Sequence, residues 1–185
     1  MLSHRLLLKS GYISQLSAGI FSFTPMGWRV ISNIKKIIDD EMKKIDCFES
    51  NLPVIQPSDI WKQSGRIDSF IPPLANFQDR RDKKMIIAPT HEEAVIDLVK
   101  NYLRSFRDLP FSLYHIQTKF RDETRPRGGL LRVREFEMKD AYSFHADEKS
   151  LDETFEKFSE AYFNIFKRCG LNVVCLLYTS DAADE

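Results

Sequence analysis

The sequence has little cysteine and no excess of charge of either sign. Its three cysteines, Cys47, Cys169 and Cys175, form no C-x-x-C pair, so neither a disulfide framework nor a zinc site is expected. Lys plus Arg and Asp plus Glu both number 27, so overall charge gives no reason to infer nucleic-acid binding. Because free thiols suit a reducing compartment, we expect a cytoplasmic protein.

Long hydrophobic runs are also missing from the sequence. No apolar segment approaches the ~20 residues that span a bilayer, and the start, MLSHRLLLKSGY, has an apolar core too short for a signal peptide. We therefore expect no membrane partner. The chain of 185 residues is 43% hydrophobic and 29% charged, a composition typical of a folded globular domain.

Apolar residues at helical spacing predict three long helices. The first follows Thr24, an N-cap residue that precedes a proline. The second follows Thr90, because T-H-E-E reads as a capping box that pairs Thr90 with Glu93. The third is predicted to begin at Ser150, which forms a second capping box with Glu153.

The remaining segments predict a sheet. Residues 47–57 read as one strand, 71–84 as a loop, and 85–89 as a short apolar strand. Two further strands, 111–123 and 130–144, flank a glycine-containing loop. The predicted fold class is α+β, with a mainly antiparallel sheet flanked by helices.

The segment KFRDETRPRGGLLRVREFEMKD, residues 119–140, carries five arginines and five carboxylates. Side chains alternate across a strand, so the polar faces of the two strands place one set of residues together if they align. That set is Arg121, Glu123, Arg132, Phe136 and Asp140. Arginine forks suit phosphate oxygens and a phenyl ring suits a base. The alternative is a solvated hairpin with surface salt bridges of little energetic weight.

The spacing within this segment resembles motif 2 of class II aminoacyl-tRNA synthetases. Residues 120–123 match F-R-x-E, and Arg132, Phe136 and Asp140 match R-x-x-x-F-x-x-x-D. The segments QTKFRDE, RPR and GLLRVREFEMKDAYSFH are similar to the bacterial-type prolyl-tRNA synthetase family. The segment APTHEEAV is also similar to this family. The region before it resembles motif 1 of the family, with a proline at Pro53. The likeness covers residues 3–174.

The resemblance implies a set of site residues. Arg121 would be the catalytic residue that contacts both the α-phosphate of ATP and the carboxylate of proline. The nucleotide would be bound by Arg121, Glu123, Arg132, Phe136 and Asp140. Proline would be bound by Thr90, Glu92 and Arg121, with Met138, Tyr142 and His145 at the edge of the pocket. The loop residues Arg125 and Arg127 would meet the nucleotide or the tRNA acceptor end.

The implied activity is ATP-dependent ligation of proline to tRNA(Pro) through a prolyl-adenylate, in the full-length protein. The implied cofactor is ATP with Mg²⁺, and no zinc is expected. The implied partners are L-proline, tRNA(Pro) and a second copy of the protein in a homodimer. His91, His115 and His145 have no metal-ligand spacing, so we expect them to be hydrogen-bonded structural residues.

The sequence departs from the family in its extent. No G-x-G-x-x-R segment resembling motif 3 is present, and neither the editing nor the anticodon-binding region is found. Residues 1–174 therefore read as the N-terminal part of the catalytic domain with motifs 1 and 2. Residues 175–185, CLLYTSDAADE, read as a non-native tail. We expect the chain alone to be inactive.

Other functions remain open on the sequence alone. One is another class II enzyme, such as a threonyl- or seryl-tRNA synthetase. A second is a non-catalytic paralogue with a regulatory or binding role. Arg121, Glu123, Thr90 and Glu92 are all present, which favours the enzyme, because such paralogues typically lose the motif arginine or the substrate-binding acid.

Overall fold

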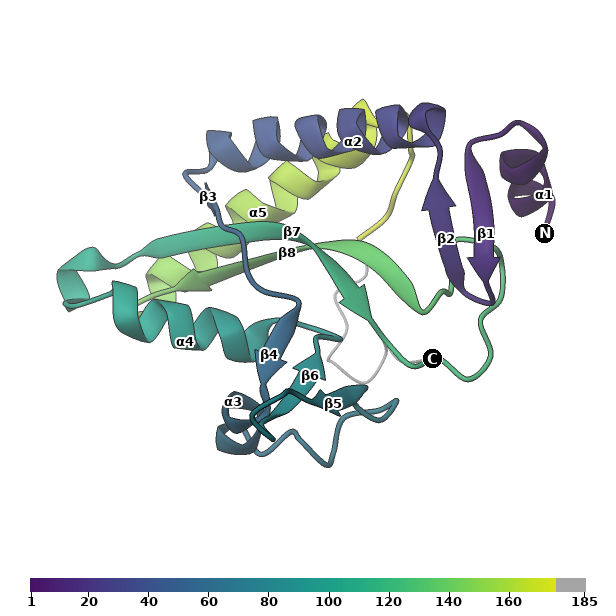
Figure 1. The fold of residues 1–185 in the computed structure, drawn as a ribbon. Coiled ribbons are helices and arrows are strands. Elements are labelled where there is room, and N and C mark those ends of the chain that lie inside the picture. The colour runs from purple at the N-terminus through teal and green to yellow at the C-terminus, as the bar shows by residue number, and fades with distance from the viewer. Residues whose placement is uncertain (176–185) are drawn as a thin grey trace.

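The long antiparallel hairpin of β7 (Phe111–Phe120) and β8 (Glu135–Phe144) is the centre of the fold. The structure is a computed structural model that describes residues 1–175. The short strand β3 (Phe48–Glu49) pairs with β7 in parallel, so the order in this sheet is β3-β7-β8. As Figure 1 shows, this sheet runs across the middle of the molecule with helices above and below it.

Helices cover both faces of this sheet. The helices α2 (Pro25–Lys44) and α5 (Glu148–Arg168) lie on one face, and α4 (Glu92–Tyr102) lies on the other (Figure 1). Successive residues of β7 point to opposite faces. Leu113 therefore packs in the core beneath α4, while Tyr114 packs in the core beneath α2 and α5.

A second, smaller sheet lies beside the first. It has the antiparallel order β4-β6-β5, with β4 (Ile55–Pro57), β6 (Lys84–Ile87) and β5 (Asn76–Gln78), and α3 (Ser58–Gln63) follows β4. The two sheets are joined at Ala88. Its N–H donates to the carbonyl of Val54 at 2.8 Å, and its carbonyl accepts from the N–H of Phe120 at 2.9 Å. The chain between the sheets is thus fixed at the end of β7.

The amino-terminal part forms a small unit at the end of the hairpin. It consists of α1 (Leu2–Lys9) and the two-stranded β1 (Ile13–Ser17) and β2 (Ile20–Phe23), as seen at the right of Figure 1. The carbonyl of Gly19, in the turn between these strands, accepts from the N–H of Arg134 at 2.8 Å. A single 3₁₀ turn, η1 (Phe106–Asp108), precedes β7.

The predicted fold class is confirmed, but several segments differ from the prediction. The hairpin strands are shorter than predicted, because β7 ends at Phe120 and β8 begins at Glu135. Residues 47–57 do not form one strand, because the chain leaves β3, passes Pro53 and enters β4 in the other sheet. Proline has no N–H to donate to a ladder, which is consistent with a break at this point. The predicted loop 71–84 contains the strand β5, which pairs with β6. This strand is too short to show an apolar pattern in the sequence.

The helix starts were predicted with mixed success. Thr24 is the N-cap of α2, and its hydroxyl accepts from the N–H of Gly27 at 3.3 Å, as expected. The start of α5 at Ser150 was wrong. Asp147 is the N-cap and accepts from the N–H of Ser150 at 2.8 Å, so Ser150 lies inside the first turn. The carboxylate of Asp147 lies beside the first free N–H groups of the helix. Asp147, and not Ser150, therefore caps them.

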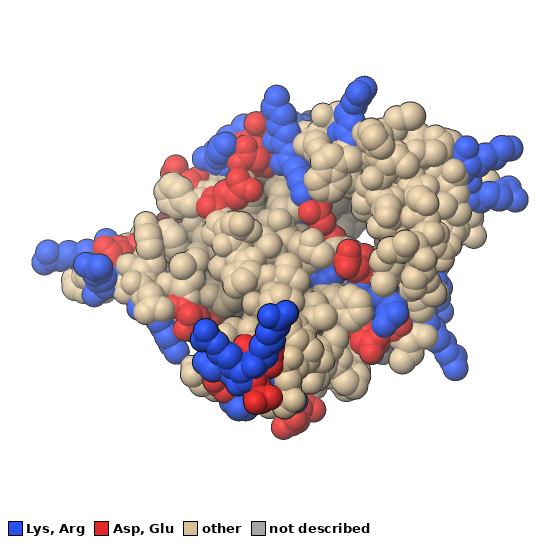
Figure 2. Space-filling view, viewed as in Figure 1, with Lys and Arg blue, Asp and Glu red and all other residues tan. Residues whose placement is uncertain are grey.

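The surface carries charges of both signs. Figure 2 shows Lys and Arg beside Asp and Glu around the outline of this face, so neither sign dominates it. None of the helices within residues 1–175 has the length and apolar composition needed to cross a bilayer. All three cysteines are free thiols. Of the predicted non-native tail, residues 176–185 lie outside the described part of the chain.

Candidate active site

An open groove lies at the end of the β7–β8 hairpin. The register places Lys119 opposite Phe136 and Gln117 opposite Met138, so these residues share one face of the ribbon. The N–H of Arg121 donates to the carbonyl of Arg134 at 2.8 Å, which extends the same pairing beyond β7. The groove has a volume of about 550 Å³. Its lining includes Arg121, Glu123, Arg132, Phe136 and Met138, together with Ile71 and Pro72 from the loop before β5.

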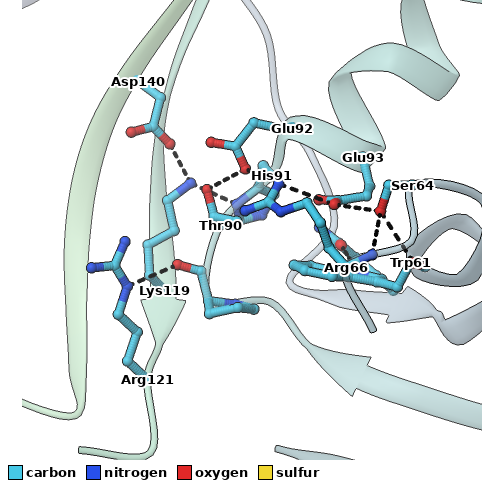
Figure 3. Close-up of polar contacts among 12 residues, drawn as sticks. Trp61, Ser64, Arg66, Thr90, His91, Glu92, Glu93, Lys119, Arg121 and Asp140 are labelled. Carbon is cyan, nitrogen blue, oxygen red and sulfur yellow. Dashed lines mark hydrogen bonds and ion pairs between the residues drawn. The ribbon is translucent and has the colours of Figure 1, made fainter. Parts of the chain in front are cut away.

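Arg121 lies at the centre of this arrangement. Its guanidinium carbon is 5.5 Å from the centroid of the Phe136 ring, so the charge lies over an aromatic face. Its Nε donates to the carbonyl of Pro89 at 3.3 Å. The side chain thus contacts Phe136 in the groove and Pro89 in the segment before α4. Figure 3 shows its contact with that segment.

Glu123 and Arg132 form the second charged pair of the groove. The Nε of Arg132 donates to Glu123 at 2.8 Å. This contact with Arg132 lowers the pKa of the Glu123 carboxyl, so the carboxylate stays ionised and holds the arginine in place. Of the five residues predicted to share one surface, Arg121, Glu123, Arg132 and Phe136 do so, and Asp140 does not.

The loop between the two strands packs against the amino-terminal unit. Arg127 and Arg132 form an isolated bridge through their backbones, with N–H to carbonyl distances of 3.0 and 3.2 Å. Gly129 has a φ of +68°, and a Cβ built there would lie 2.6 Å from the Cβ of His4. The loop thus requires glycine where it touches α1. The side chains of Arg125 and Arg127 are exposed and lie outside the groove lining.

A second polar cluster lies at the start of α4, within the segment Pro89–Glu92. The hydroxyl of Thr90 donates to Oε2 of Glu92 at 2.6 Å, and Nη1 of Arg66 donates to the same oxygen at 3.3 Å (Figure 3). The predicted capping box of Thr90 with Glu93 was wrong. His91 is the N-cap of α4 without a side-chain cap, and Glu93 instead accepts from Ser64 at 2.9 Å. The hydroxyl of Thr90 contacts Glu92 instead of Glu93.

Glu92 is an ionised carboxylate in a partly enclosed position. Burial acts to raise the pKa of Glu92, but hydrogen bonds from Thr90, the backbone and Arg66 outweigh it and lower the pKa. Burial raises the pKa of the Tyr142 phenol, and the neighbouring Glu92 carboxylate adds to this shift. Tyr142 therefore stays neutral beside the negative charge. A carboxylate with a hydroxyl and a phenol around it suits a ligand that carries a cationic N–H group.

Between the two parts lies a buried network around Lys119. The Nζ of Lys119 is 2.5 Å from Asp140, 2.6 Å from Nδ1 of His91 and 3.0 Å from Nε2 of His115. His91, His115 and Asp140 offer ligand atoms within 4.8 Å of one another, as in a metal site. The ammonium group of Lys119 already lies among these atoms, so the histidines act as structural hydrogen-bonding residues there.

Two predicted site residues do not reach the groove. Asp140 directs its carboxylate to Lys119 and His115; burial acts to raise its pKa, but these contacts lower it to about 2. His145 follows the far end of β8, nine residues beyond Phe136, a strand distance of about 30 Å. Its Nδ1 contacts Ser150 at 2.8 Å. Its placement at the edge of the amino-acid pocket, three residues beyond Tyr142, stays a prediction.

Sequence reasoning did not single out two residues that shape the site. Lys119 shares the strand face of Arg121 by alternation, so its position was predictable but its partners were not. Arg66 lies in the loop after α3 and packs over the Trp61 ring at 5.6 Å while it contacts Glu92 and Glu93. Nothing in the spacing of Arg66 indicates these contacts, because they join segments far apart in the chain.

The fold and the site together define a class of protein. The family model of the tRNA synthetase class II core domain (G, H, P, S and T) matches residues 76–184. The chain belongs to this family. The match includes the segment before α4, the hairpin β7–β8 and the helix α5.

Curated relatives indicate the particular branch of the family. The chain is 54% identical over 170 residues to the proline–tRNA ligase of Dehalococcoides mccartyi, with 92% of the chain and 30% of the relative covered. It is 52% identical to that of Pediococcus pentosaceus, over 93% of the chain and 30% of the relative. The resemblance to bacterial prolyl-tRNA synthetases is thus confirmed. The chain spans about 30% of the length of these relatives.

Solved structures agree on the fold. The prolyl-tRNA synthetase of Giardia lamblia in complex with prolyl-adenylate aligns with a TM-score of 0.80 at 22% identity, over 88% of this chain and 34% of that one. The enzyme of Cryptosporidium parvum complexed with halofuginone and AMPPNP aligns with a TM-score of 0.79 at 20% identity, over 89% and 35%.

Proposed function

We propose that the full-length protein containing this chain ligates proline to tRNA(Pro) through a prolyl-adenylate. The observation that carries the proposal is the position of Arg121. It lies over Phe136 in the groove and also contacts Pro89, the residue before Thr90. One guanidinium group is thus within reach of both a nucleotide and an amino acid, and such a group can bridge the two reactants.

The groove has the parts that a nucleoside triphosphate needs. Phe136 offers a flat ring for the adenine, and base stacking on an aromatic ring is worth about 1–3 kcal/mol in single-strand binders. Arg121 and Arg132 offer planar donors for phosphate oxygens. Glu123 orients Arg132 through the 2.8 Å contact. The exposed loop arginines Arg125 and Arg127 would meet the nucleotide or the acceptor end of the tRNA.

The cluster before α4 suits the amino acid. The imino group of proline is cationic and carries two N–H donors, which the carboxylate of Glu92 and the hydroxyl of Thr90 can accept. The carboxylate of proline would meet Arg121. Met138, on the groove face of β8, and Tyr142, beside Glu92, would bound the ring. His145 would lie at the edge of this pocket, beyond Tyr142, whereas Asp140 is left out of the nucleotide-binding residues because its carboxylate contacts Lys119.

The chemistry needs no general base. The carboxylate of proline is already a nucleophile at neutral pH, and it attacks the α-phosphorus of ATP while pyrophosphate leaves. Catalysis then consists of holding the two groups in line and neutralising the charge that develops. Arg121 would do both because it contacts the carboxylate and the α-phosphate. The terminal ribose hydroxyl of the tRNA then attacks the carbonyl carbon of the adenylate, which forms the ester and releases AMP and a proton.

Magnesium would enter with its nucleotide. Two carboxylates line the groove within residues 1–175, and both are engaged: Glu123 by Arg132 at 2.8 Å and Glu137 by Lys35 at 2.7 Å. Mg²⁺ is commonly bound through substrate phosphates with few protein ligands. We therefore treat Mg-ATP as the substrate and assign no metal site to these residues.

The wider setting is part of the same proposal. Residues 1–174 would be the N-terminal part of the catalytic domain, with the remaining ATP contacts and further domains in the rest of the full-length protein. The motif 1 region around α2 and Pro53 would serve a homodimer. The free thiols suit a cytoplasmic location.

Pyrophosphate exchange by the full-length protein tests this proposal. With ATP present, proline is expected to support exchange at a far higher kcat/KM than threonine, serine or alanine. Preference for threonine or serine would favour another enzyme of the family. Absence of exchange with every amino acid, in a protein that folds and binds ATP, would favour a non-catalytic paralogue and contradict the proposal.

A further inference from the structure

Lys119 is a fully buried lysine within the proposed site, and the proposed chemistry does not use it. Its side chain has no solvent exposure, and its ammonium group contacts Asp140, His91 and His115 at 2.5 to 3.0 Å. A lysine ammonium has three N–H donors and no acceptor. Its three donors therefore match its three partners in number.

The network is balanced in charge. Asp140 supplies one negative charge for the positive charge of Lys119. Burial and the neighbouring Lys119 lower the pKa of His91 to about 4, so His91 is neutral and its Nδ1 accepts from the lysine. His115 serves either neighbour according to its tautomer: with Nε2 protonated it donates to Asp140 at 2.9 Å, and with Nε2 bare it accepts from Lys119.

The network also fixes the segment Pro89–Glu92 against the end of β7. Three consecutive residues of β7 and its continuation hold that segment and Ala88 before it. The N–H of Phe120 donates to Ala88 at 2.9 Å, and Arg121 donates to Pro89 at 3.3 Å. Lys119 contacts His91 at 2.6 Å. Of these contacts, only that of Lys119 reaches a residue after Thr90. This residue is His91, which lies between Thr90 and Glu92 in the chain.

A strong contact is needed at this point because α4 begins without a side-chain cap. His91 is the N-cap residue, yet its ring is turned toward Lys119, which contacts Nδ1 at 2.6 Å. The direction of Thr90 and Glu92 therefore depends on how the ring of His91 is held. Figure 3 shows Lys119 reaching up between Asp140 and the His91 ring, beside the Thr90–Glu92 pair.

We propose that Lys119 is a positioning residue for the amino acid. Its ammonium group contacts both His91 and Asp140 and holds them together. The cluster has the ligand spacing of a metal site, and the ammonium group occupies the place of the cation. This fixes Thr90 and Glu92 in the orientation that receives the cationic group of the substrate. The inference rests on the proposed function, because it assigns the segment Pro89–Glu92 to amino-acid binding.

A role in positioning differs from a role in stability alone. If Lys119 only stabilises the domain, its loss lowers the free energy of unfolding but leaves the affinities of the folded protein unchanged. If it positions the segment, its loss raises the KM for proline and leaves the KM for ATP nearly unchanged. The groove residues that would bind ATP lie on the hairpin and its loop, where the backbone pairing of β7 with β8 and the Glu123–Arg132 contact remain when the Lys119 side chain is lost.

The test uses two variants of the full-length protein. Lys119→Met leaves the half-buried carboxylate of Asp140 without its cation, which is destabilising. The double variant Lys119→Met/Asp140→Asn removes both charges and is the decisive one. Lys139→Met is the matched control, because Lys139 is the neighbouring lysine on β8, is half-buried and contacts Tyr162 on the other face. Proline-dependent pyrophosphate exchange is measured with each substrate varied in turn.

For the double variant we expect a KM for proline raised about ten- to a hundredfold, because small misplacements cost that much. Its KM for ATP stays within about twofold, and Lys139→Met resembles the parent. A folded double variant with an unchanged KM for proline would overturn the proposal. So would equal increases in both KM values, or a double variant that fails to fold. A parent protein without proline-dependent exchange would instead overturn the proposed function, and this inference with it.

Discussion

Individual side chains in the site are set by their neighbours more than by their own type. Glu92 and Glu93 are adjacent in the chain, yet Glu92 faces Thr90 while Glu93 is held by Ser64 and Arg66. Lys119 is buried and charged beside the half-buried carboxylate of Asp140, and the buried charge is tolerated because that partner is present. The residue types alone allow several roles, and the contacts select one.

The buried His91 leads to a prediction about acid stability. Its pKa is about 4 in the folded chain, against 6.5 for an ordinary histidine, because of burial and the neighbouring Lys119. Between these values the unfolded chain binds a proton that the folded chain does not bind, so stability falls as the pH is lowered from about 7 to 4. The group contributes about 3 kcal/mol to this fall.

Urea denaturation at a series of pH values measures this dependence. The variant His91→Asn keeps a hydrogen-bond acceptor for Lys119 but cannot take up the proton. We expect its free energy of unfolding to depend less steeply on pH in this range than that of the parent. Parallel curves for the two proteins would show that His91 is not the group responsible.

Helices and strands were predicted where local signals agreed with one another. Thr24, the following proline and the apolar period all indicated α2, and its cap is as expected. Arg121, Arg132 and Phe136 line one groove as predicted, although Arg121 and Arg132 lie outside β7 and β8, so strand alternation alone does not place them. At the start of α5 the S-x-x-E pattern indicated Ser150, whereas Asp147, three residues earlier, is the cap.

The cap of α5 gives a prediction for this element. Asp147 accepts from the N–H of Ser150, so Asp147→Ala is expected to lower the free energy of unfolding by about 1 kcal/mol. Asp147→Asn should be nearly neutral, because asparagine caps equally well. Thermal or urea unfolding checks both variants. Equal losses for alanine and asparagine would assign the effect to charge and not to the cap.

The parts of the fold that sequence could not give are those made by distant segments. The chain between β3 and β4 crosses from one sheet to the other, and β5 forms only because β6 offers it an edge. The Lys119 network joins β7, β8 and the start of α4, and the Arg66 contacts join the loop after α3 to α4. Periodicity reports which face of an element is apolar, but not which elements meet.

The whole molecule places its site where its two sheets meet. The larger sheet supplies the groove at the end of the hairpin, and the smaller sheet leads into the segment Pro89–Glu92 through the Ala88 junction. Arg121 is the side chain that contacts both. Its removal should therefore affect the nucleotide and the amino acid together, whereas changes on one side should affect one substrate.

Proline-dependent pyrophosphate exchange by the full-length Arg121→Ala variant is the most direct measurement of this role. Arg107→Ala, at an exposed arginine in η1, is the matched control. We expect Arg121→Ala to fold normally and to lose about a hundred- to a thousandfold in kcat, the scale for removing one donor to developing charge. A variant whose kcat and KM values for both substrates stay within about twofold of the parent would contradict the assignment of the site.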